Sequence, residues 1–426
     1  MKDSSQVDEL VSHVSRVANE TYGHSRPFMP EQPWWKNLDP VFHRFPDTFY
    51  LEWRAQLLVW VLSWLDVLVR FFLASAAVTG ALFSTLRRLK EDDRQRHFYA
   101  GLADAGEREQ IFVEPAFVPL VHRRQVLSDV APAGAVVEDL RFDSRFEVIN
   151  PALAEHYARF KRNNVVHAQY WHHGDGPRPT LIIAHGFMLS SYRVNARFFS
   201  AGWFFRQGYD VILYTQPFHG WRREKWAPFS GHGVFSYGIS HVNEMFAQSV
   251  FDFRSLLNWL DSQGVRHYGV TGISLGGYLS ALLAATEKRL AFSIPVVPVA
   301  SLTDVMFQWA PAGWLIRGGL RLVNISVQEA RHSGAATSPL TWAPLLDKSR
   351  LMVIGGAGDR IVPPKHARLL WDHWQQPLMH WFPGNHLVHV DQGRYLRQMA
   401  AFMRGLGFAP KQPAQGDSDA PVSAEG

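Results

Sequence analysis

Short apolar runs alternate with helical stretches along this chain beyond about residue 177, after a region of mixed pattern that begins near residue 111. Runs that are apolar at nearly every position are typical of strands buried on both faces of a parallel sheet. The predicted strands are 138–148, 165–172, 180–184, 210–214, 266–271, 291–297, 351–355 and 378–382, and the predicted helices are 151–161, 191–206, 238–262, 275–288, 365–374 and 388–405. This alternation predicts an α/β fold with a doubly wound, mostly parallel sheet and helices on both of its faces.

One connection in this pattern is too long for an ordinary loop. Residues 298–347 separate two predicted strands and carry large apolar side chains such as Trp309 and Trp314. Long connections without structure of their own are uncommon in compact domains, so we expect a cap inserted over the site. The main domain is then 111–408, and the Pro-, Ser- and Ala-rich tail 409–426 is expected to be disordered.

The first 110 residues form an N-terminal extension with its own pattern. Residues 1–49 are polar and then rich in proline and aromatic residues, which predicts an irregular arm. Residues 57–83 form an apolar helical segment whose only charges, Asp66 and Arg70, would share one helix face and could pair. The charged stretch 84–108 predicts a solvated helix or linker.

Three interpretations of segment 57–83 stay open. Its length is enough for a membrane span, but an aspartate and an arginine near its middle are costly in lipid. An interfacial helix fits the tryptophans along it and the basic residues that follow it. The third interpretation is a helix packed on the main domain or on a second subunit.

Composition and charge limit the compartment and the partners. The 426 residues contain no cysteine, which excludes disulfides, thiolate catalysis and Cys-ligated metal sites and fits a reducing compartment. The formal net charge of +5 is spread over short groups such as residues 222–225, so anionic lipid is favoured over nucleic acid as a partner. Because the N-terminus lacks the regions of a secretory signal, we expect a cytoplasmic protein. Peripheral contact at the inner membrane face is expected if segment 57–83 is an interfacial helix.

The sequence around Ser274 carries the clearest chemical signal. Gly272-Ile273-Ser274-Leu275-Gly276 follows a predicted strand and precedes a predicted helix, which is the setting of a nucleophile elbow. A serine in such a turn has a strained backbone, and Gly272 and Gly276 leave space where side chains would collide. Ser274 is therefore the candidate nucleophile.

A nucleophilic serine needs a base and an acid that orients the base. Asp359 follows the predicted strand 351–355, and the carboxyl ends of parallel strands share the ligand-binding edge. His386 follows the last predicted strand after a Pro-Gly turn and is the preferred base. Asp304 is the reserve acid and His389 the second candidate base.

Two backbone N–H groups are candidates for the oxyanion hole. One is that of Leu275, at the start of the helix after the nucleophile. The other is that of Phe187 in His185-Gly186-Phe187, where Gly186 permits close approach of the backbone to a substrate. We expect His185 to be structural, and Phe187 to narrow the acyl pocket.

Together these motifs and Gln216-Pro217-Phe218-His219-Gly220 resemble the α/β-hydrolase superfamily over about residues 165–405. The resemblance implies a serine hydrolase that cleaves a carboxylic ester without a metal or organic cofactor. It does not separate esterases from lipases or acyltransferases.

Other functions stay open beside that of a carboxylic ester hydrolase. A membrane-associated lipase or phospholipid acyl hydrolase would use the apolar segment and the basic group at 222–225. An acyltransferase would pass the acyl group to an acceptor other than water. An inactive scaffold or binding module would not need the serine, aspartate and histidine together.

Overall fold

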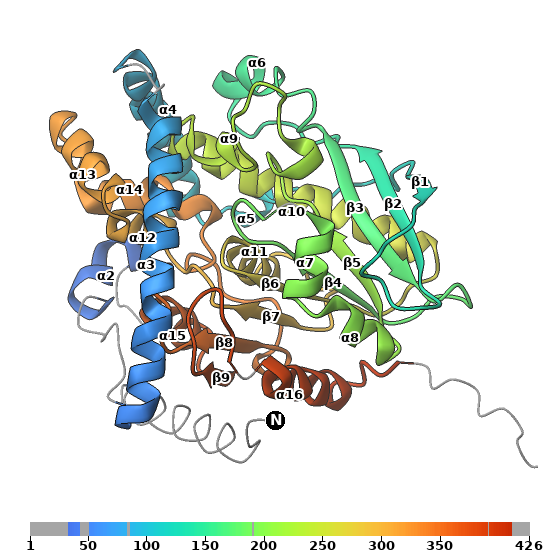
Figure 1. Ribbon diagram of the computed structural model, residues 1–426. Helices are drawn as coiled ribbons and strands as arrows, with labels where there is room; N and C mark the ends of the chain where they lie inside the picture. Colours follow the sequence, from blue (N-terminus) through green and yellow to red (C-terminus); the bar gives the residue numbers. More distant parts are fainter. Residues whose placement is uncertain (1–32, 43–50, 83–85, 190, 391, 411–426) are drawn as a thin grey trace, which may run out of the picture.

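The computed structural model describes residues 33–42, 51–82, 86–189, 191–390 and 392–410. Its described residues form one nine-stranded sheet with the strand order β1-β2-β3-β5-β4-β6-β7-β8-β9 (Figure 1). The strands are β1 (His122–Gln125), β2 (Val136–Asp143), β3 (Val165–His172), β4 (Thr180–Ala184), β5 (Asp210–Tyr214), β6 (Tyr268–Ile273), β7 (Ser293–Val296), β8 (Met352–Gly356) and β9 (Leu378–Phe382). The expected α/β fold is confirmed, and β1 is the strand that the sequence pattern did not predict.

Pairing divides the sheet into two parts. Strands β1, β2, β3 and β5 pair antiparallel in that order, whereas β5, β4, β6, β7, β8 and β9 pair in parallel. In the parallel part, β4 is buried at every position. Its side chains alternate, with Leu181 and Ile183 in one apolar cluster and Ile182 and Ala184 in the other. The sheet therefore needs a helical layer on each face.

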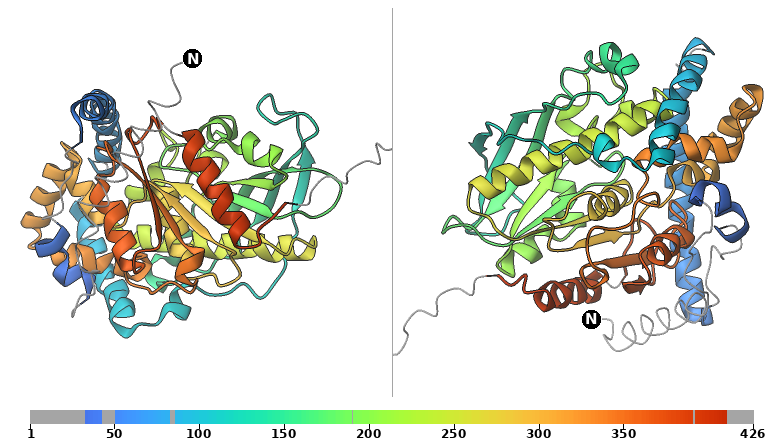
Figure 2. Two further views of the ribbon diagram at one scale, coloured as in Figure 1. Left: turned by 90° about the horizontal axis from the view of Figure 1, so that it is seen from below. Right: turned by 180° about the vertical axis from the view of Figure 1, so that it is seen from behind.

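Two sets of helices supply these layers (Figures 1 and 2). On the face that Figure 1 presents lie α7 (Tyr192–Phe198), α8 (Ala201–Arg206) and α16 (Gln392–Gly405). The other face is covered by α10 (Ile239–Ser262), α11 (Leu275–Ala284) and α15 (Pro364–His373). Helix 191–206 was predicted as one element but is broken at Ser200, which has a positive φ of 52°.

The long connection 298–347, for which a cap over the site was predicted, is mostly helical. It contains α12 (Leu302–Gln308), α13 (Ala312–Leu322) and α14 (Val327–Ser333) and the short 3-10 helix Ala335–Thr337. A buried ion pair of 2.5 Å joins Arg331 in α14 to Asp304 in α12. The remaining short helices of the main domain are α5 (Arg108–Ile111), α6 (Ala154–Tyr157) and α9 (His232–Phe235), with 3-10 turns at Pro151–Leu153, Gly220–Arg222 and Lys348–Arg350.

The N-terminal extension is more ordered than the sequence pattern indicated. Residues 34–42 form helix α2 (Trp34–Phe42), whose Trp34, Trp35, Leu38 and Phe42 are buried in the main apolar cluster. The prediction of an irregular arm is therefore wrong for this helix, because its aromatic and apolar residues fall on one side of it. The rest of segment 1–49, and the tail from 411, lie outside the described residues.

Helix α3 (Trp53–Leu82) contains the apolar segment and is followed by α4 (Leu86–Ala105). Within the described residues, Gln56–Ser75 is the helix long and apolar enough to cross a membrane by length and composition alone, with a mean hydropathy of 2.0. In Figures 1 and 2, α3 runs along the side of the molecule, at the end of the sheet opposite β1. It packs on the main domain through one face.

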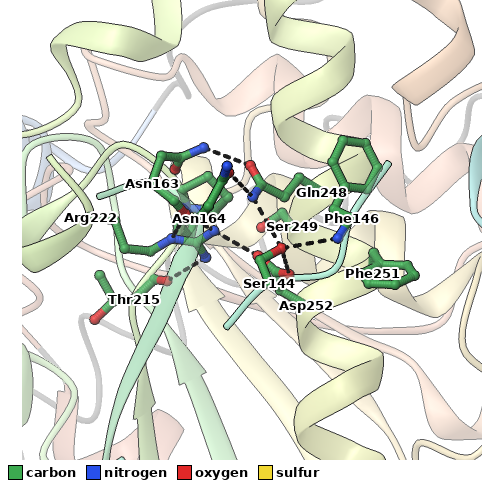
Figure 3. Close-up of polar contacts among 12 residues, drawn as sticks. Ser144, Phe146, Asn163, Asn164, Thr215, Arg222, Gln248, Ser249, Phe251 and Asp252 are labelled. Carbon is green, nitrogen blue, oxygen red and sulfur yellow. Dashed lines mark hydrogen bonds and ion pairs between the residues drawn. The ribbon is translucent and has the colours of Figure 1, made fainter. Parts of the chain in front are cut away.

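Figure 3 shows a buried polar network between α10 and the loops beside β2, β3 and β5. Arg222 is fully buried, and its Nη2 donates to the Asp252 carboxylate at 2.6 Å and to the Asn163 carbonyl at 2.7 Å. The other oxygen of Asp252 accepts the Ser144 hydroxyl at 2.5 Å. The suggestion that Arg222 meets an anionic head group is therefore wrong for this residue, because its charge is already paired in the interior.

We expect Arg222→Ala to lower the free energy of unfolding by about 3–5 kcal/mol, because it leaves the Asp252 carboxylate buried without its cation. Urea denaturation measures the change. The control is Lys225→Ala, an exposed neighbour whose loss should cost no more than about 0.5 kcal/mol. Equal stability of the two variants would contradict the structural role of the ion pair.

Candidate active site

Ser274 lies in the sharp turn between β6 and α11, at the carboxyl end of the parallel strands. Its backbone has φ 56° and ψ −113°, a conformation that residues with a side chain rarely adopt. The residue is partly exposed, whereas Ile273 and Leu275 on either side are buried. Such local strain persists only when the surrounding structure holds it, and it is common at functional sites.

The two glycines of the motif are required by the crowding of this turn. A Cβ atom at Gly272 would collide with the carbonyl oxygen of Gly276, and one at Gly276 would collide with that of Ala184 at the end of β4. The elbow therefore packs directly against the β4 loop. This packing brings the turn of Ser274 beside His185-Gly186-Phe187, as the sequence motifs led us to expect.

The proposed oxyanion donors stand on these two adjoining segments. Leu275 is the first residue of α11, so its N–H has no acceptor in the preceding turn of the helix. Within the described residues, neither the N–H of Leu275 nor that of Phe187 donates a backbone hydrogen bond. Both N–H groups are therefore without a backbone acceptor among the described residues and could meet a substrate oxygen.

The side chains of the β4 loop differ in character. The Phe187 ring packs against Phe235 and Phe229, with ring centroids 5.2 and 6.4 Å away. His185 is buried between the Gly186 carbonyl and the backbone N–H of Gln216. Burial lowers the pKa of His185 to about 4, which keeps the ring neutral and fits the expected structural role.

Asp359 and His386 are brought together by the ends of β8 and β9. His386 Nδ1 donates to Asp359 Oδ2 at 2.6 Å, and both side chains are buried. Asp359 Oδ1 accepts the backbone N–H groups of Ile361 and Val362 at 2.9 and 2.7 Å. Since the carboxylate accepts the proton of Nδ1, the Nε2 lone pair of His386 is left for use as a base.

The alternative acid and bases have other partners. Asp304 is held by Arg331 and by the Ser301 hydroxyl. His389 Nδ1 lies 2.7 Å from the Tyr395 hydroxyl, and burial lowers the pKa of His389 to about 3. His380 lies in β9 and contacts a glutamine of α16. Of these candidates, His386 and Asp359 are the pair that the fold brings together.

Ser274 stands at the same sheet edge but is not hydrogen-bonded to His386. Within the described residues, neither the Ser274 hydroxyl nor Nε2 of His386 has a hydrogen-bond partner. Catalytic hydrogen bonds are often long in free enzymes and shorten when substrate binds. The described contacts therefore join Asp359 to His386 and do not include Ser274.

Helix α3 adds a second carboxylate to this site that the sequence had not connected with it. Asp66 is fully buried, and its Oδ2 accepts the backbone N–H groups of Arg360 and His386, each at 2.9 Å. Arg70 shares the helix face with Asp66 as expected, but its Nη1 donates to the Arg360 carbonyl at 3.0 Å. The sequence showed only an aspartate within an apolar run. It gave no indication that the partners of this aspartate are the backbone N–H groups of residues 360 and 386.

The pKa values of Asp66 and His386 are both raised, but by different causes. Burial and the Asp359 charge raise the pKa of Asp66 to about 7, against the influence of His386 and the two backbone N–H groups. For His386, burial lowers the pKa, but the charge and hydrogen bond of Asp359 and the charge of Asp66 outweigh it and raise the pKa. The imidazole is therefore a stronger base than an ordinary histidine.

Comparison with known proteins agrees with this fold. Residues 190–308 match the family described as α/β hydrolase domain containing 18. Two uncharacterized proteins from two strains of Mycobacterium tuberculosis are each 32% identical to this chain over 271 residues. That match covers 61% of this chain and 62% of the length of each relative.

Two solved esterase structures share the fold at low sequence identity. Acetyl xylan esterase 1 from a Thermoanaerobacterium species matches with a TM-score of 0.51 and 18% sequence identity. The match covers 76% of this chain and 99% of the esterase chain. The acetyl xylan esterase from a Paenibacillus species has a TM-score of 0.51, 15% identity and the same coverage. The sheet, the family match over residues 190–308 and these two structures together show that the chain has the α/β-hydrolase fold.

Proposed function

We propose that this α/β hydrolase is a serine hydrolase that cleaves carboxylic esters through an acyl-enzyme on Ser274. The observation that carries the proposal is the strained turn of Ser274 at the sheet edge where Asp359 and His386 share a hydrogen bond of 2.6 Å. A hydroxyl, an imidazole and a carboxylate at one edge are the groups that this chemistry requires.

Each group has a defined task in the proposed reaction. As the Ser274 oxygen attacks the ester carbonyl, Nε2 of His386 takes the hydroxyl proton, and Asp359 stabilises the imidazolium. The N–H groups of Leu275 and Phe187 hold the oxyanion, each contributing about 3 kcal/mol in the transition state. The imidazolium then protonates the departing alkoxide, and a second cycle with water releases the carboxylic acid and restores Ser274.

A lipid ester at a membrane surface is the second candidate substrate, favoured by the polarity of α3. The helix turns its polar residues Ser63, Asp66 and Arg70 toward the main domain. Its opposite face exposes large apolar side chains: Trp53, Leu57, Trp60, Val61, Trp64, Leu65, Leu68, Phe71 and Phe72. Helices of soluble proteins have the reverse arrangement, so this face needs an apolar environment.

A membrane interface supplies such an environment for this face. Tryptophan side chains are favoured at the level of lipid head groups, and Trp60 and Trp64 are 58% and 54% exposed. The sequence places Arg87, Arg88 and Lys90 just after α3, where anionic lipid would attract them. Because the polar face is bonded to the main domain, we propose that α3 lies along the membrane surface.

Replacing the nucleophile tests the first proposal. Ser274→Ala is expected to abolish hydrolysis of p-nitrophenyl acetate and covalent labelling by a fluorophosphonate, because no other group on the elbow can be acylated. The matched control, Ser349→Ala, removes an exposed hydroxyl far from the elbow in the sequence and should keep both activities. Labelling that persists in Ser274→Ala would place the nucleophile elsewhere.

Histidine variants test the choice of base. His386→Ala is expected to lower kcat by about 10²–10⁴-fold, the usual contribution of a general base. The control is His380→Ala, which removes a histidine from the neighbouring strand β9 and leaves the His386–Asp359 hydrogen bond in place. It should keep most of the activity. A stopped assay of p-nitrophenyl ester turnover compares the variants, and a larger loss in His380→Ala than in His386→Ala would contradict the assignment.

Vesicle flotation tests the proposed lipid surface. The full chain is expected to float with vesicles of phosphatidylcholine and phosphatidylglycerol, and the double variant Trp60→Glu, Leu68→Glu to lose this binding because charge is costly in the apolar interface. The control, Leu120→Glu with Leu127→Glu, alters two exposed leucines outside α3 and should still float. If neither the full chain nor the variants float with the vesicles, the proposal is contradicted.

A further inference from the structure

We propose that Asp66 of helix α3 is a positioning residue for the catalytic histidine and its acid. This inference rests on the proposed serine hydrolase function and adds a role for the N-terminal extension.

The contacts of α3 fall on the two segments that follow β8 and β9. On the β8 side, the Ser63 hydroxyl donates to the Gly358 carbonyl at 2.8 Å, and Asp66 accepts the N–H of Arg360. On the β9 side, Asp66 also accepts the N–H of His386. One carboxylate oxygen therefore joins the segment of the proposed acid to the segment of the proposed base.

Further contacts fix the position of the helix itself. Asn385 Nδ2 donates to the Leu62 carbonyl at 2.6 Å, next to His386. A Cβ atom at Gly358 would lie 2.7 Å from a methyl group of Val59, so the β8 segment and α3 are in close packing. Val59, Ser63 and Asp66 lie on one helix face at spacings of four and three residues. This face is thus fitted to the active-site segments along more than one turn.

Burial makes the Asp66 contact more than incidental. The side chain has no exposed surface, and Oδ1 has no hydrogen-bond partner within the described residues. Burying a carboxylate costs free energy unless its oxygens are hydrogen-bonded. A helix that served only as an apolar surface element would be more stable with leucine at this position. The aspartate is explained by what it does for the backbone of residues 360 and 386.

Charge is the second way in which Asp66 acts on His386. The other charged and titratable groups that contact His386 are Asp359, which accepts from Nδ1, and His389, whose ring meets the His386 carbonyl. Arg70 lies further along α3 and donates to the Arg360 carbonyl. Because the pKa of Asp66 is raised to about 7, its carboxylate is ionised above neutral pH, where it favours the imidazolium that forms when His386 accepts the serine proton. Since His386 must be neutral to act as a base, activity is lost as the pH falls through its pKa.

Two substitutions separate the backbone support from the charge. Asp66→Asn keeps an oxygen acceptor for the two N–H groups and removes the charge. We expect kcat at the pH optimum to stay near that of the parent, and the acid limb of kcat/KM to move to lower pH because the pKa of His386 falls. Asp66→Ala removes the acceptor too and is expected to lower kcat at least about tenfold, with KM little changed.

The matched control is Leu65→Ala, on the exposed face of the same helix, which should leave both kcat and the pH profile unchanged. Circular dichroism and thermal unfolding establish that each variant is folded. If Asp66→Ala does not fold, the acid limb of Asp66→Asn still decides: an unmoved limb would overturn the role of the charge and the proposal with it.

Amide hydrogen exchange supplies a readout that needs no turnover. Peptides covering residues 358–362 and 384–388 should exchange faster in Asp66→Ala than in the parent, and Asp66→Asn should restore protection, because it keeps the acceptor. An inactive parent protein with this exchange pattern would contradict the hydrolase function but not the positioning role. An active parent whose Asp66 variants match it in exchange and pH profile would overturn the inference.

Discussion

The buried hydrogen bond between Asp359 and His386 is the interaction on which the site depends. It fixes the imidazole so that Nδ1 carries the proton and Nε2 presents the lone pair. The bond requires β8 and β9 to end side by side, which parallel pairing in this register provides. Two backbone N–H groups hold the other carboxylate oxygen, so the acid cannot turn away from the histidine. The parallel pairing of β8 and β9 therefore sets the position of both partners in this hydrogen bond.

The second constraint is the crowding around Ser274. Its strained backbone is held by the packing of β4, β6 and α11. This packing leaves no room for a side chain at positions 272 and 276, and both are glycine. Among the described residues, the N–H groups of Leu275 and Phe187 have no backbone acceptor. The strained serine and the two N–H groups thus lie on two adjoining segments, the turn after β6 and the loop after β4, which is the arrangement that the proposed attack on a carbonyl group requires.

Helix α3 connects these features to the surface of the molecule. A polar stripe bonded to the segments of Asp359 and His386 is combined with an apolar face exposed on the other side. This inverted polarity explains why the segment satisfies the length and hydropathy of a membrane helix while carrying a charge at its centre. Asp66, which would be costly in lipid, points toward the protein instead, where its carboxylate accepts the backbone N–H groups of Arg360 and His386.

The sequence alone determined the α/β class, most strands of the sheet, the elbow and the preferred acid and base, because these depend on local periodicity, turn glycines and chain order. Strands β3, β4, β5 and β9 have the predicted bounds. Only the tertiary structure decided that Arg222 is paired inside, that Trp34–Phe42 is a packed helix, and that Asp66 meets His386 across 320 residues of chain. Those outcomes depend on which distant group lies opposite each side chain, and local pattern carries no information about such contacts.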